Sequence, residues 1–470
     1  MELILEEKDA DDWLYRGEGA ANLVLGYSGS SSAFVGKVIR VPKASLKKSE
    51  AVTSATILTT HEQLLWKDMP ELVICSSKEM ISHFFALHVM CPLLGYTHTD
   101  AGRLVRVSKE FLEEVEKRII GLRPVWRVDA AKVNTFCDYA LLMSDHSLFS
   151  HGLLSESHCI AVEVKPKCGF LPFSSFIAEA NAIKKKVSRF KMHQALKFHQ
   201  GEISELSLYD PLGLFSGSRE RMSHAIESLF TTPQNNFRVF LDGLLIYGGL
   251  GGYSEATCSL MDACERGKEF VGMLDGVIKA SNDMRLSSFI ELVTEAFHHS
   301  GVLNKLLEVQ KLDLFDIEGA IHAYYDIISQ PCNICKNLHD EEMIQRCSFF
   351  HSLPLEESLK IVREYLISVT AKDCSVMISF QPRRDGEMDD IYDSIYLTST
   401  SQSFNYKVHF IDLDMKPLKK MVYHYELDQK ITSCYRMHMV KAGAGNCECV
   451  QNAKPRTGVI DIKHEQSNKV

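Results

Sequence analysis

No apolar run in the sequence is long enough to cross a bilayer, because charged residues interrupt each hydrophobic stretch well before that length. The first eight residues, from Met1 to Lys8, are too acidic for a signal peptide. We therefore expect a soluble protein of the cytoplasm and nucleus that is not secreted and has no membrane partner.

The sequence also lacks a regular cysteine spacing, an excess of positive charge and an internal repeat. Its 14 scattered cysteines argue against a disulfide scaffold and for reduced thiols. The net charge of −9 argues against non-specific nucleic-acid binding, which usually needs a basic surface. If the ligand is a polyanion, basic residues must be concentrated locally.

What the sequence has is an ordinary globular composition, with 45% hydrophobic and 24% charged residues in 470. That length is too great for one hydrophobic core, so two lobes are expected. We predict an α+β monomer with three parts: a smaller N-terminal lobe with an antiparallel sheet (1–146), a larger α+β C-terminal lobe (147–435), and a disordered tail (436–470).

Hydrophobic periodicity and turn residues predict the elements of both lobes. The Asp242-Gly243 pair predicts a type I′ hairpin turn, and the glycine-rich stretch 248–252 and the segment 382–390 are predicted loops. Strands are predicted at 22–27, 33–41, 139–143, 159–164, 237–241, 244–247, 375–380 and 406–413. Helices are predicted at 78–91, 108–120, 184–197, 287–310, 314–329 and 355–371.

A glycine-rich turn runs from Arg16 to Asn22 between strand candidates. Its backbone amides could approach phosphates closely; the alternative is a tight turn that needs glycine only for its own geometry. Lys37 and Arg40 on the next strand point to opposite faces, so only one of them can reach a nucleotide bound there.

The run from Glu163 to Lys167 ends an apolar strand. If the strand persists through Pro166, then Glu163, Lys165 and Lys167 lie on one side of it. Two like charges on one face repel unless an anion sits between them, which favours a phosphate cradle. The alternative is an exposed edge strand protected by lysine and proline.

Further basic groups could meet the same anion. On the predicted helix 184–197, Lys186, Phe190, His193 and Lys197 share a face, although a charged helix face is usually only solvated. The run from Asn235 to Arg238 offers amides and a guanidinium, although paired asparagines often only form a turn.

Carboxylates follow near the C-terminus. Asp373 lies at a helix-to-strand junction, and Asp412 and Asp414 end a strand. Phosphate transfer needs one carboxylate for the metal and a second group to orient or deprotonate the attacking hydroxyl, although isolated aspartates often act only as caps. Further cationic or proton-sharing groups follow directly: Lys416, Lys419, Lys420 and His424.

Cys332 and Cys335 have the spacing of zinc ligands. His322 and His351 flank them, and His339 is a competing ligand. We predict a closed structural zinc site; the alternative is two unpaired core thiols.

Taken together, these residues resemble the inositol-pentakisphosphate 2-kinase family, especially its plant members, from Leu5 to about Asp428. The motifs that carry the resemblance are Arg-Gly-Glu-Gly at 16–19, Glu-x-Lys-Pro-Lys at 163–167, Asn-Asn-Phe-Arg-Val-Phe at 235–240, Thr-Ala-Lys-Asp-Cys-Ser at 370–375 and Phe-Ile-Asp-Leu at 410–413.

The resemblance implies a two-lobed kinase-like fold that uses ATP to phosphorylate the 2-hydroxyl of inositol 1,3,4,5,6-pentakisphosphate, giving inositol hexakisphosphate (phytate). Residues implied to hold ATP are Gly19, Ala20, Ala21, Asn22, Arg40, Ser144, Asp145, His146, Glu163, Val164, Lys165 and Arg238, with Asp412 on Mg²⁺. Those implied for the inositol phosphate are Arg127, Lys167, Lys197, Asn235, Lys416, Lys420 and His424. Asp373 and Lys165 would lie beside the reacting hydroxyl, and the implied zinc ligands are His322, Cys332, Cys335 and His351.

The sequence departs from the family's usual residues at four positions. Ser144 replaces asparagine, Lys420 and Ser45 replace arginine, and His424 replaces tyrosine. Two rival readings stay open: a non-catalytic inositol phosphate sensor or scaffold, and a kinase of different positional specificity. The intact Asp373 and Asp412 argue against the first rival.

Overall fold

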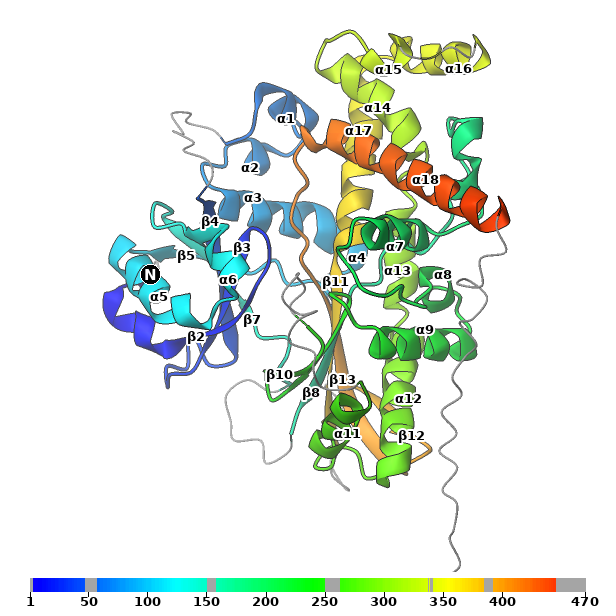
Figure 1. Ribbon diagram of the computed structural model, residues 1–470. Coiled ribbons are helices and arrows are strands. Elements are labelled where there is room, and N and C mark those ends of the chain that lie inside the picture. Colours follow the sequence, from blue (N-terminus) through cyan, green and yellow to red (C-terminus); the bar gives the residue numbers. More distant parts are fainter. Residues whose placement is uncertain are drawn as a thin grey trace, which may run out of the picture.

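The computed structural model describes residues 3–46, 57–149, 158–249, 263–336, 338, 341–383 and 392–444, which form a mixed α+β structure with two sheets (Figure 1). The first sheet has the order β1-β5-β7-β4-β3-β2, with β6 beside β4. Its pairs are antiparallel except for β1 with β5, which corrects the expectation of a purely antiparallel sheet. The strands are β1 (Ile4–Leu5), β2 (Trp13–Glu18), β3 (Asn22–Tyr27), β4 (Lys37–Ser45), β5 (Arg103–Val107), β6 (Ala131–Val133) and β7 (Tyr139–Ser144).

The second sheet has the order β10-β9-β8-β11-β13-β12, and all its pairs are antiparallel. Asp242 and Gly243 have positive φ in the β9–β10 turn, as a type I′ turn requires. The strands are β8 (Ile160–Val164), β9 (Phe237–Leu241), β10 (Leu244–Tyr247), β11 (Ser375–Pro382), β12 (Asp393–Leu397) and β13 (Gln402–Ile411).

Helices cover both sheets, and α12, α13 and α14 follow one another up the right side of Figure 1. In the first half of the chain the helices are α1 (Thr60–Leu65), α2 (Pro70–Val73), α3 (Lys78–Phe85), α4 (Cys91–Leu94), α5 (Lys109–Ile119), α6 (Val125–Val128), α7 (Arg189–His199), α8 (Pro211–Leu214) and α9 (Arg219–Thr231). The later ones are α11 (Ala263–Met273), α12 (Asn282–Ser300), α13 (Val302–Gln310), α14 (Asp316–Ile327), α15 (Asn333–Lys336), α16 (Glu341–His351), α17 (Leu355–Asp373) and α18 (Lys420–Ala444).

Two hydrophobic cores accompany the two sheets. The smaller core joins the first sheet to α5, whose Ser108 caps the helix through the amide of Phe111 at 3.0 Å. The larger core joins the second sheet to the later helices, and it also contains residues 58–94 from α1 to α4. The first sheet ends at Ser144 and the second begins at Ile160, while the domain ranges themselves stay a prediction.

Four predicted elements differ from the structure because local backbone geometry interrupts them. Gly301, with φ 65°, separates α12 from α13 inside the range predicted as one helix. A 3-10 segment, Glu179–Lys185, precedes α7, which starts at Arg189 after the Ser188 cap; Lys186 therefore lies outside the predicted basic helix face. The helix predicted at 78–91 contains a π-helical turn, Ala86–Met90, and the strand predicted at 33–41 starts only at Lys37.

The C-terminal helix corrects one boundary. It continues to Ala444, so residues 436–444, which were predicted to belong to a disordered tail, are helical, and the rest of that prediction, 445–470, lies outside the described residues. Most of the loops predicted at 248–252 and 382–390 also lie outside them. Across the described part of the chain, no helix combines the length and the apolar character of a membrane span.

Candidate active site

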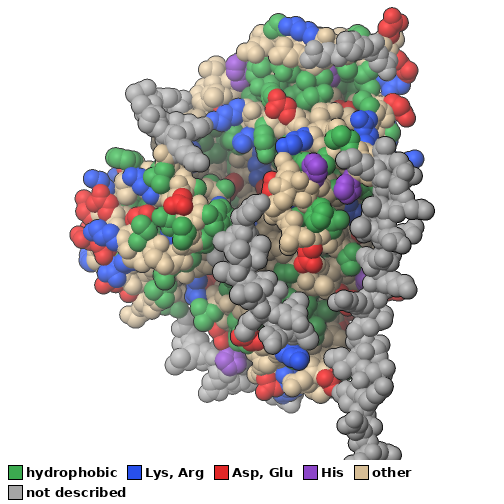
Figure 2. Space-filling model, viewed as in Figure 1, with side chains coloured by type: hydrophobic (Ala, Val, Ile, Leu, Met, Phe, Trp, Pro, Cys, Tyr) green, Lys and Arg blue, Asp and Glu red, His purple; other side chains and the backbone are tan. Residues whose placement is uncertain are grey.

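Two adjoining cavities lie beside the end of β8. The first encloses about 340 Å³ and the second about 500 Å³. Asn235 lines both of them, and the segment from Glu163 to Lys167 contributes Glu163 and Lys165 to the first cavity and Lys167 to the second. Figure 2 shows one face of the molecule. On the part of this face that is built on the first sheet, the described Asp and Glu side chains are mixed with Lys and Arg side chains.

Strand β4 and the turn before β3 form one wall of the first cavity. Arg40 lines it and its Nη2 donates to Asp414 Oδ2 at 2.6 Å, whereas Lys37 is not among the lining residues and donates to Ser144 Oγ at 3.1 Å. The carboxylate of Asp414 is thus already partnered by a partly buried guanidinium.

A buried ion pair holds the glycine-rich turn in place. Gly19 and Ala20 line the first cavity, but Ala21 and Asn22 are not among the lining residues. Beneath them the carboxylate of Glu18 is buried and accepts from Arg123 Nε at 2.9 Å. Because a buried carboxylate needs such partners, this contact holds the turn in place.

The segment after β7 forms the far wall, and Ser144, Asp145 and His146 all line the first cavity. The imidazole of His146 stacks on His409 with ring centroids 3.9 Å apart. These residues connect the two sheets, since β7 belongs to the first and His409 to β13 of the second.

Charged groups from the second sheet close the first cavity. Glu163 accepts from Arg238 Nη1 at 3.0 Å and from Ser375 Oγ at 2.8 Å. Lys165 Nζ donates to Asp412 Oδ2 at 2.9 Å. Burial alone would lower the pKa of Lys165, but Asp412 and Glu163 outweigh it and raise this pKa, so the lysine is charged.

The strand does not persist through Pro166, as the prediction of three charges on one face assumed. It ends at Val164, which is buried in the core and lines neither cavity, and Lys167 has φ 62°. The backbone turn therefore sends Lys165 into the first cavity and Lys167 into the second. Each lysine meets a carboxylate rather than its neighbour.

Asp373 lies in the second cavity, at the end of α17. It accepts from Lys416 Nζ at 2.8 Å and from Lys167 Nζ at 3.4 Å. Burial would raise the pKa of Asp373, but Lys167 and Lys416 outweigh that effect and lower it to about 2. The carboxylate is thus ionised at neutral pH and able to accept a hydrogen bond or a proton.

The remaining predicted polyanion residues divide between the cavities. Lys197, Lys420 and His424 line the second one with Asn235, whereas Arg127 lines the first. The guanidinium of Arg127 lies 4.0 Å from the centre of the Trp126 ring. Burial, followed by nearby cations, lowers the pKa of His424 to about 4, so its imidazole is neutral at pH 7.

Three cations of the second cavity were missed in the sequence: Lys184, Arg189 and Lys372. A readable signal existed for Arg189, because Arg189, His193 and Lys197 are spaced at i, i+4 and i+8 on α7. The face that was chosen from the sequence began at Lys186, before the helix.

A possible metal group lies apart from both cavities, where α14, α15 and α16 meet. The ligand atoms of His322, Cys332, Cys335 and His351 all lie within 4.8 Å of one another. Cys335 Sγ is 3.3 Å from both His322 Nδ1 and His351 Nε2, a spacing that fits two ligands on one tetrahedral ion. His339, the competing ligand, lies outside the described residues.

The other ring nitrogen of His351 supports the same interpretation. His351 Nδ1 lies 2.6 Å from Asp326 Oδ1, the arrangement that commonly orients a metal-ligating histidine. Two thiols and two imidazoles thus face one another as four candidate ligands for one metal ion, and the Asp326 carboxylate orients one of the imidazoles.

Two adjoining cavities lined by cations, each with an aspartate that is paired with lysine, are the kind of site expected of a phosphotransferase. Comparison with known proteins makes the class specific. The model of the family described as inositol-pentakisphosphate 2-kinase matches residues 15–430.

Similar proteins carry the same description. An inositol-pentakisphosphate 2-kinase from Arabidopsis thaliana is 53% identical over 97% of this chain and 99% of its own length. One from Oryza sativa subsp. japonica is 52% identical over 93% and 96%, and one from Danio rerio is 30% identical over 92% and 94%. The chain belongs to the inositol-pentakisphosphate 2-kinase family.

Proposed function

We propose that this protein transfers the γ-phosphate of ATP to the 2-hydroxyl of inositol 1,3,4,5,6-pentakisphosphate and forms inositol hexakisphosphate. Family membership supports the activity. The observation that carries it here is the division of the Glu163–Lys167 segment between two adjoining cavities. One cavity takes the nucleotide and the other takes the inositol phosphate.

In this proposal the two sheets belong to the two lobes of a kinase-like fold, with ATP between them. Gly19 and Ala20 approach the phosphates, and Arg40 and Lys165 supply charge. The segment 144–146 meets the base. Ala21, Asn22 and Val164 do not line the cavity, so their proposed role is to support the lining residues from the turn before β3 and from strands β3 and β8.

Asp412 is the proposed Mg²⁺ ligand, since its carboxylate lies in the first cavity beside Lys165. Burial would raise its pKa, but Lys165 and Arg40 outweigh burial and lower it, so the ligand oxygens are ionised. When bound, Mg²⁺ neutralises charge on the transferring phosphoryl group.

The inositol phosphate occupies the second cavity, because each phosphate carries about −1.5 to −2 charge at pH 7 and needs several converging cations. Lys167, Lys197, Lys416 and Lys420 supply them from three separate segments. Arg127 and Asn235 would meet the substrate where the two cavities join. Arg189 and Lys372 extend this set.

Asp373 is the proposed base. The 2-hydroxyl oxygen attacks the γ-phosphorus, the hydroxyl proton passes to the Asp373 carboxylate, and the bond from phosphorus to the ADP oxygen breaks. The low pKa of Asp373, about 2, means that it accepts the proton late, as the new phosphate ester forms. Lys165 stabilises the transferring charge.

The His322, Cys332, Cys335 and His351 group is proposed to bind structural zinc, because all four positions are filled by protein ligands. The free thiols of the described cysteines support a reducing compartment, in keeping with the cytoplasm and nucleus. A monomer remains our proposal for the oligomeric state.

One product-identified assay tests the proposal. The wild-type protein with ATP, Mg²⁺ and inositol pentakisphosphate should give inositol hexakisphosphate, while Asp373→Ala should lose turnover and still bind ATP. A protein that binds the substrate but never phosphorylates it would instead be a sensor. A product that carries a pyrophosphate group and still has a free 2-hydroxyl would overturn the positional assignment, and an active Asp373→Ala variant would overturn the base.

A further inference from the structure

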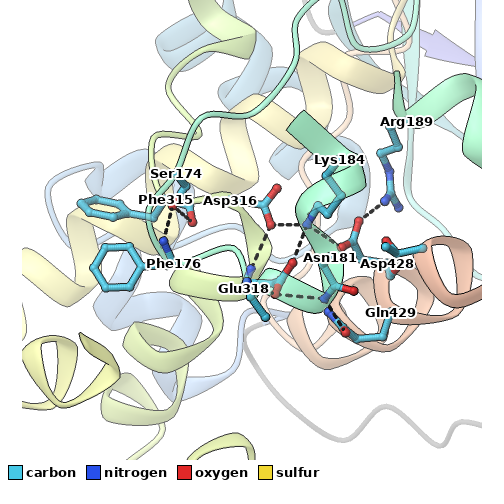
Figure 3. Close-up of polar contacts among 12 residues, drawn as sticks. Ser174, Phe176, Asn181, Lys184, Arg189, Phe315, Asp316, Glu318, Asp428 and Gln429 are labelled. Carbon is cyan, nitrogen blue, oxygen red and sulfur yellow. Dashed lines mark hydrogen bonds and ion pairs between the residues drawn. The ribbon is translucent and has the colours of Figure 1, made fainter. Parts of the chain in front are cut away.

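A buried ionic cluster forms the floor of the second cavity (Figure 3). Lys184, which is only 3% exposed, directs its Nζ to three carboxylates. The distances are 2.5 Å to Asp316 Oδ1, 3.0 Å to Glu318 Oε1 and 2.7 Å to Asp428 Oδ2. The lysine follows β8, two carboxylates come from α14 and the third comes from α18.

One carboxylate of this cluster reaches out to the cavity wall. Asp428 accepts from Lys184 through Oδ2 and from Arg189 Nη1 through Oδ1. Both oxygens of Asp428 are therefore engaged, and its plane is fixed. Arg189 lines the cavity and its side chain is 38% exposed, so the rest of its guanidinium remains open to the cavity.

The net charge of the cluster is unfavourable for the polyanion that the second cavity is proposed to bind. Three carboxylates against one ammonium and Arg189 leave a net charge of −1 at full ionisation, close to a site for a polyanion. Negative charge at that place repels phosphate. The negative charge has a role if it orders the Arg189 guanidinium. An arginine that is already ordered loses less entropy when its planar guanidinium binds phosphate.

We propose that Asp428, held by Lys184, is a positioning residue that presents the Arg189 guanidinium to a phosphate of the polyanion. This inference rests on the proposed function of the second cavity. Asp428 itself does not touch the substrate; it acts through Arg189.

The substitution Asp428→Asn distinguishes a positioning role from a simple charge effect, because the two predict opposite changes in the affinity for the polyanion. Removing a negative charge should tighten polyanion binding, whereas releasing Arg189 should weaken it. We expect the KM for inositol pentakisphosphate and the Kd for inositol hexakisphosphate to rise about tenfold, as for loss of a charged hydrogen-bond partner. The KM for ATP should not change.

Asp316→Asn is the matched control. It likewise replaces a carboxylate partner of Lys184 with an amide, but Asp316 does not contact Arg189. Asparagine tolerates the φ of 60° at this position. This variant should bind inositol hexakisphosphate more tightly than the wild type.

A double-mutant cycle completes the test. In an Arg189→Met background, Asp428→Asn should no longer weaken binding, because the group that it positions is gone. Asp428→Glu, which keeps the charge and displaces the carboxylate, should weaken binding if Asp428→Asn fails to fold in a thermal melt. Tighter binding by Asp428→Asn, or unchanged binding by Asp428→Glu, would overturn the positioning role of Asp428. Neither result would contradict the proposed kinase function, which is tested with the wild type. Failure of the wild type to bind or phosphorylate inositol pentakisphosphate would instead refute the proposed function.

Discussion

At the scale of single residues, each of the central lysines has an aspartate as partner. Lys165 pairs with Asp412, and Lys167 and Lys416 share Asp373. Half-buried charges of one sign would repel each other, so these pairings stabilise the site before substrate arrives. The proposed metal ligand and the proposed base are thus both ionised and both held in position.

The pKa of His424 gives a residue-scale prediction. Burial and then Arg189 and Lys416 lower it to about 4, against about 6.5 in an unfolded chain. Between these two values the unfolded state binds more protons, so the contribution of neutral His424 to stability is present above pH 6.5 and is lost as the pH falls. Urea unfolding of His424→Gln should therefore show a smaller loss of unfolding free energy between pH 7 and pH 5 than the wild type.

The control for this measurement is His199→Gln, since His199 is exposed at the end of α7. An equal pH dependence for His424→Gln and the wild type would show that burial and the nearby cations do not keep His424 neutral in the folded protein.

Much of the site could be predicted at residue scale, because its motifs are local. The run from Glu163 to Lys167 is visible as a cluster of charge, and so is the Asp373 junction. The division of the two lysines between cavities was not predictable, since it depends on the positive φ of Lys167. The contact of Arg189 with Asp428 was not predictable either, since the two residues lie 239 positions apart in the sequence.

At the scale of elements, short helices converge on the possible metal group. α15 has only four residues, and α14 and α16 contribute one histidine each. A four-residue helix is not stable alone, so its order depends on tertiary contacts. A bound metal would supply them.

Removal of the metal should therefore unfold this region locally. After treatment with a zinc chelator, backbone amides of α15 and α16 should exchange faster with deuterium, and Cys335→Ser should have the same effect without chelator. The strands of the second sheet should exchange more slowly than these helices in both samples. Cys137→Ser, in the first-sheet part, is the matched control. Unchanged exchange in α15 and α16 would show that no metal orders them.

Elements with local signals were predicted better than those set by context. Ser108 and the apolar spacing after it mark the start of α5, and Asp242-Gly243 marks the hairpin. The break at Gly301 had a readable signal that was overlooked, since glycine commonly ends helices. The 3-10 segment before α7 had none, because the buried Lys184 in it is held by carboxylates distant in the sequence.

At the scale of the whole molecule, the proposed substrate sites span both sheets. Arg127 belongs to α6 beside the first sheet, whereas Lys167 and Asn235 belong to the second-sheet part. A ligand that contacts all three would tie the two parts together. Binding and ordering would then be coupled.

Hydrogen exchange tests this coupling. Inositol pentakisphosphate should slow exchange in α6 and β6, which lie next to Arg127, because binding reduces opening of the first-sheet part. Arg127→Ala should abolish the slowing there while α7 remains protected by the same ligand. If exchange in α6 and β6 were unchanged in the wild type, the substrate would not bridge the two parts.

The larger core also has a consequence for biosynthesis. Its helices α1 and α4 are translated early, yet they pack on α17 and α13, which emerge more than 200 residues later. At about 5–20 residues per second, α1 would wait on the order of 10 s or more for its partner. During that interval the apolar face of α1 is without its partner and is open to a chaperone or to other parts of the nascent chain. The first-sheet part, whose last strand ends at Ser144, can fold before α1 and α4 have packed on α17 and α13.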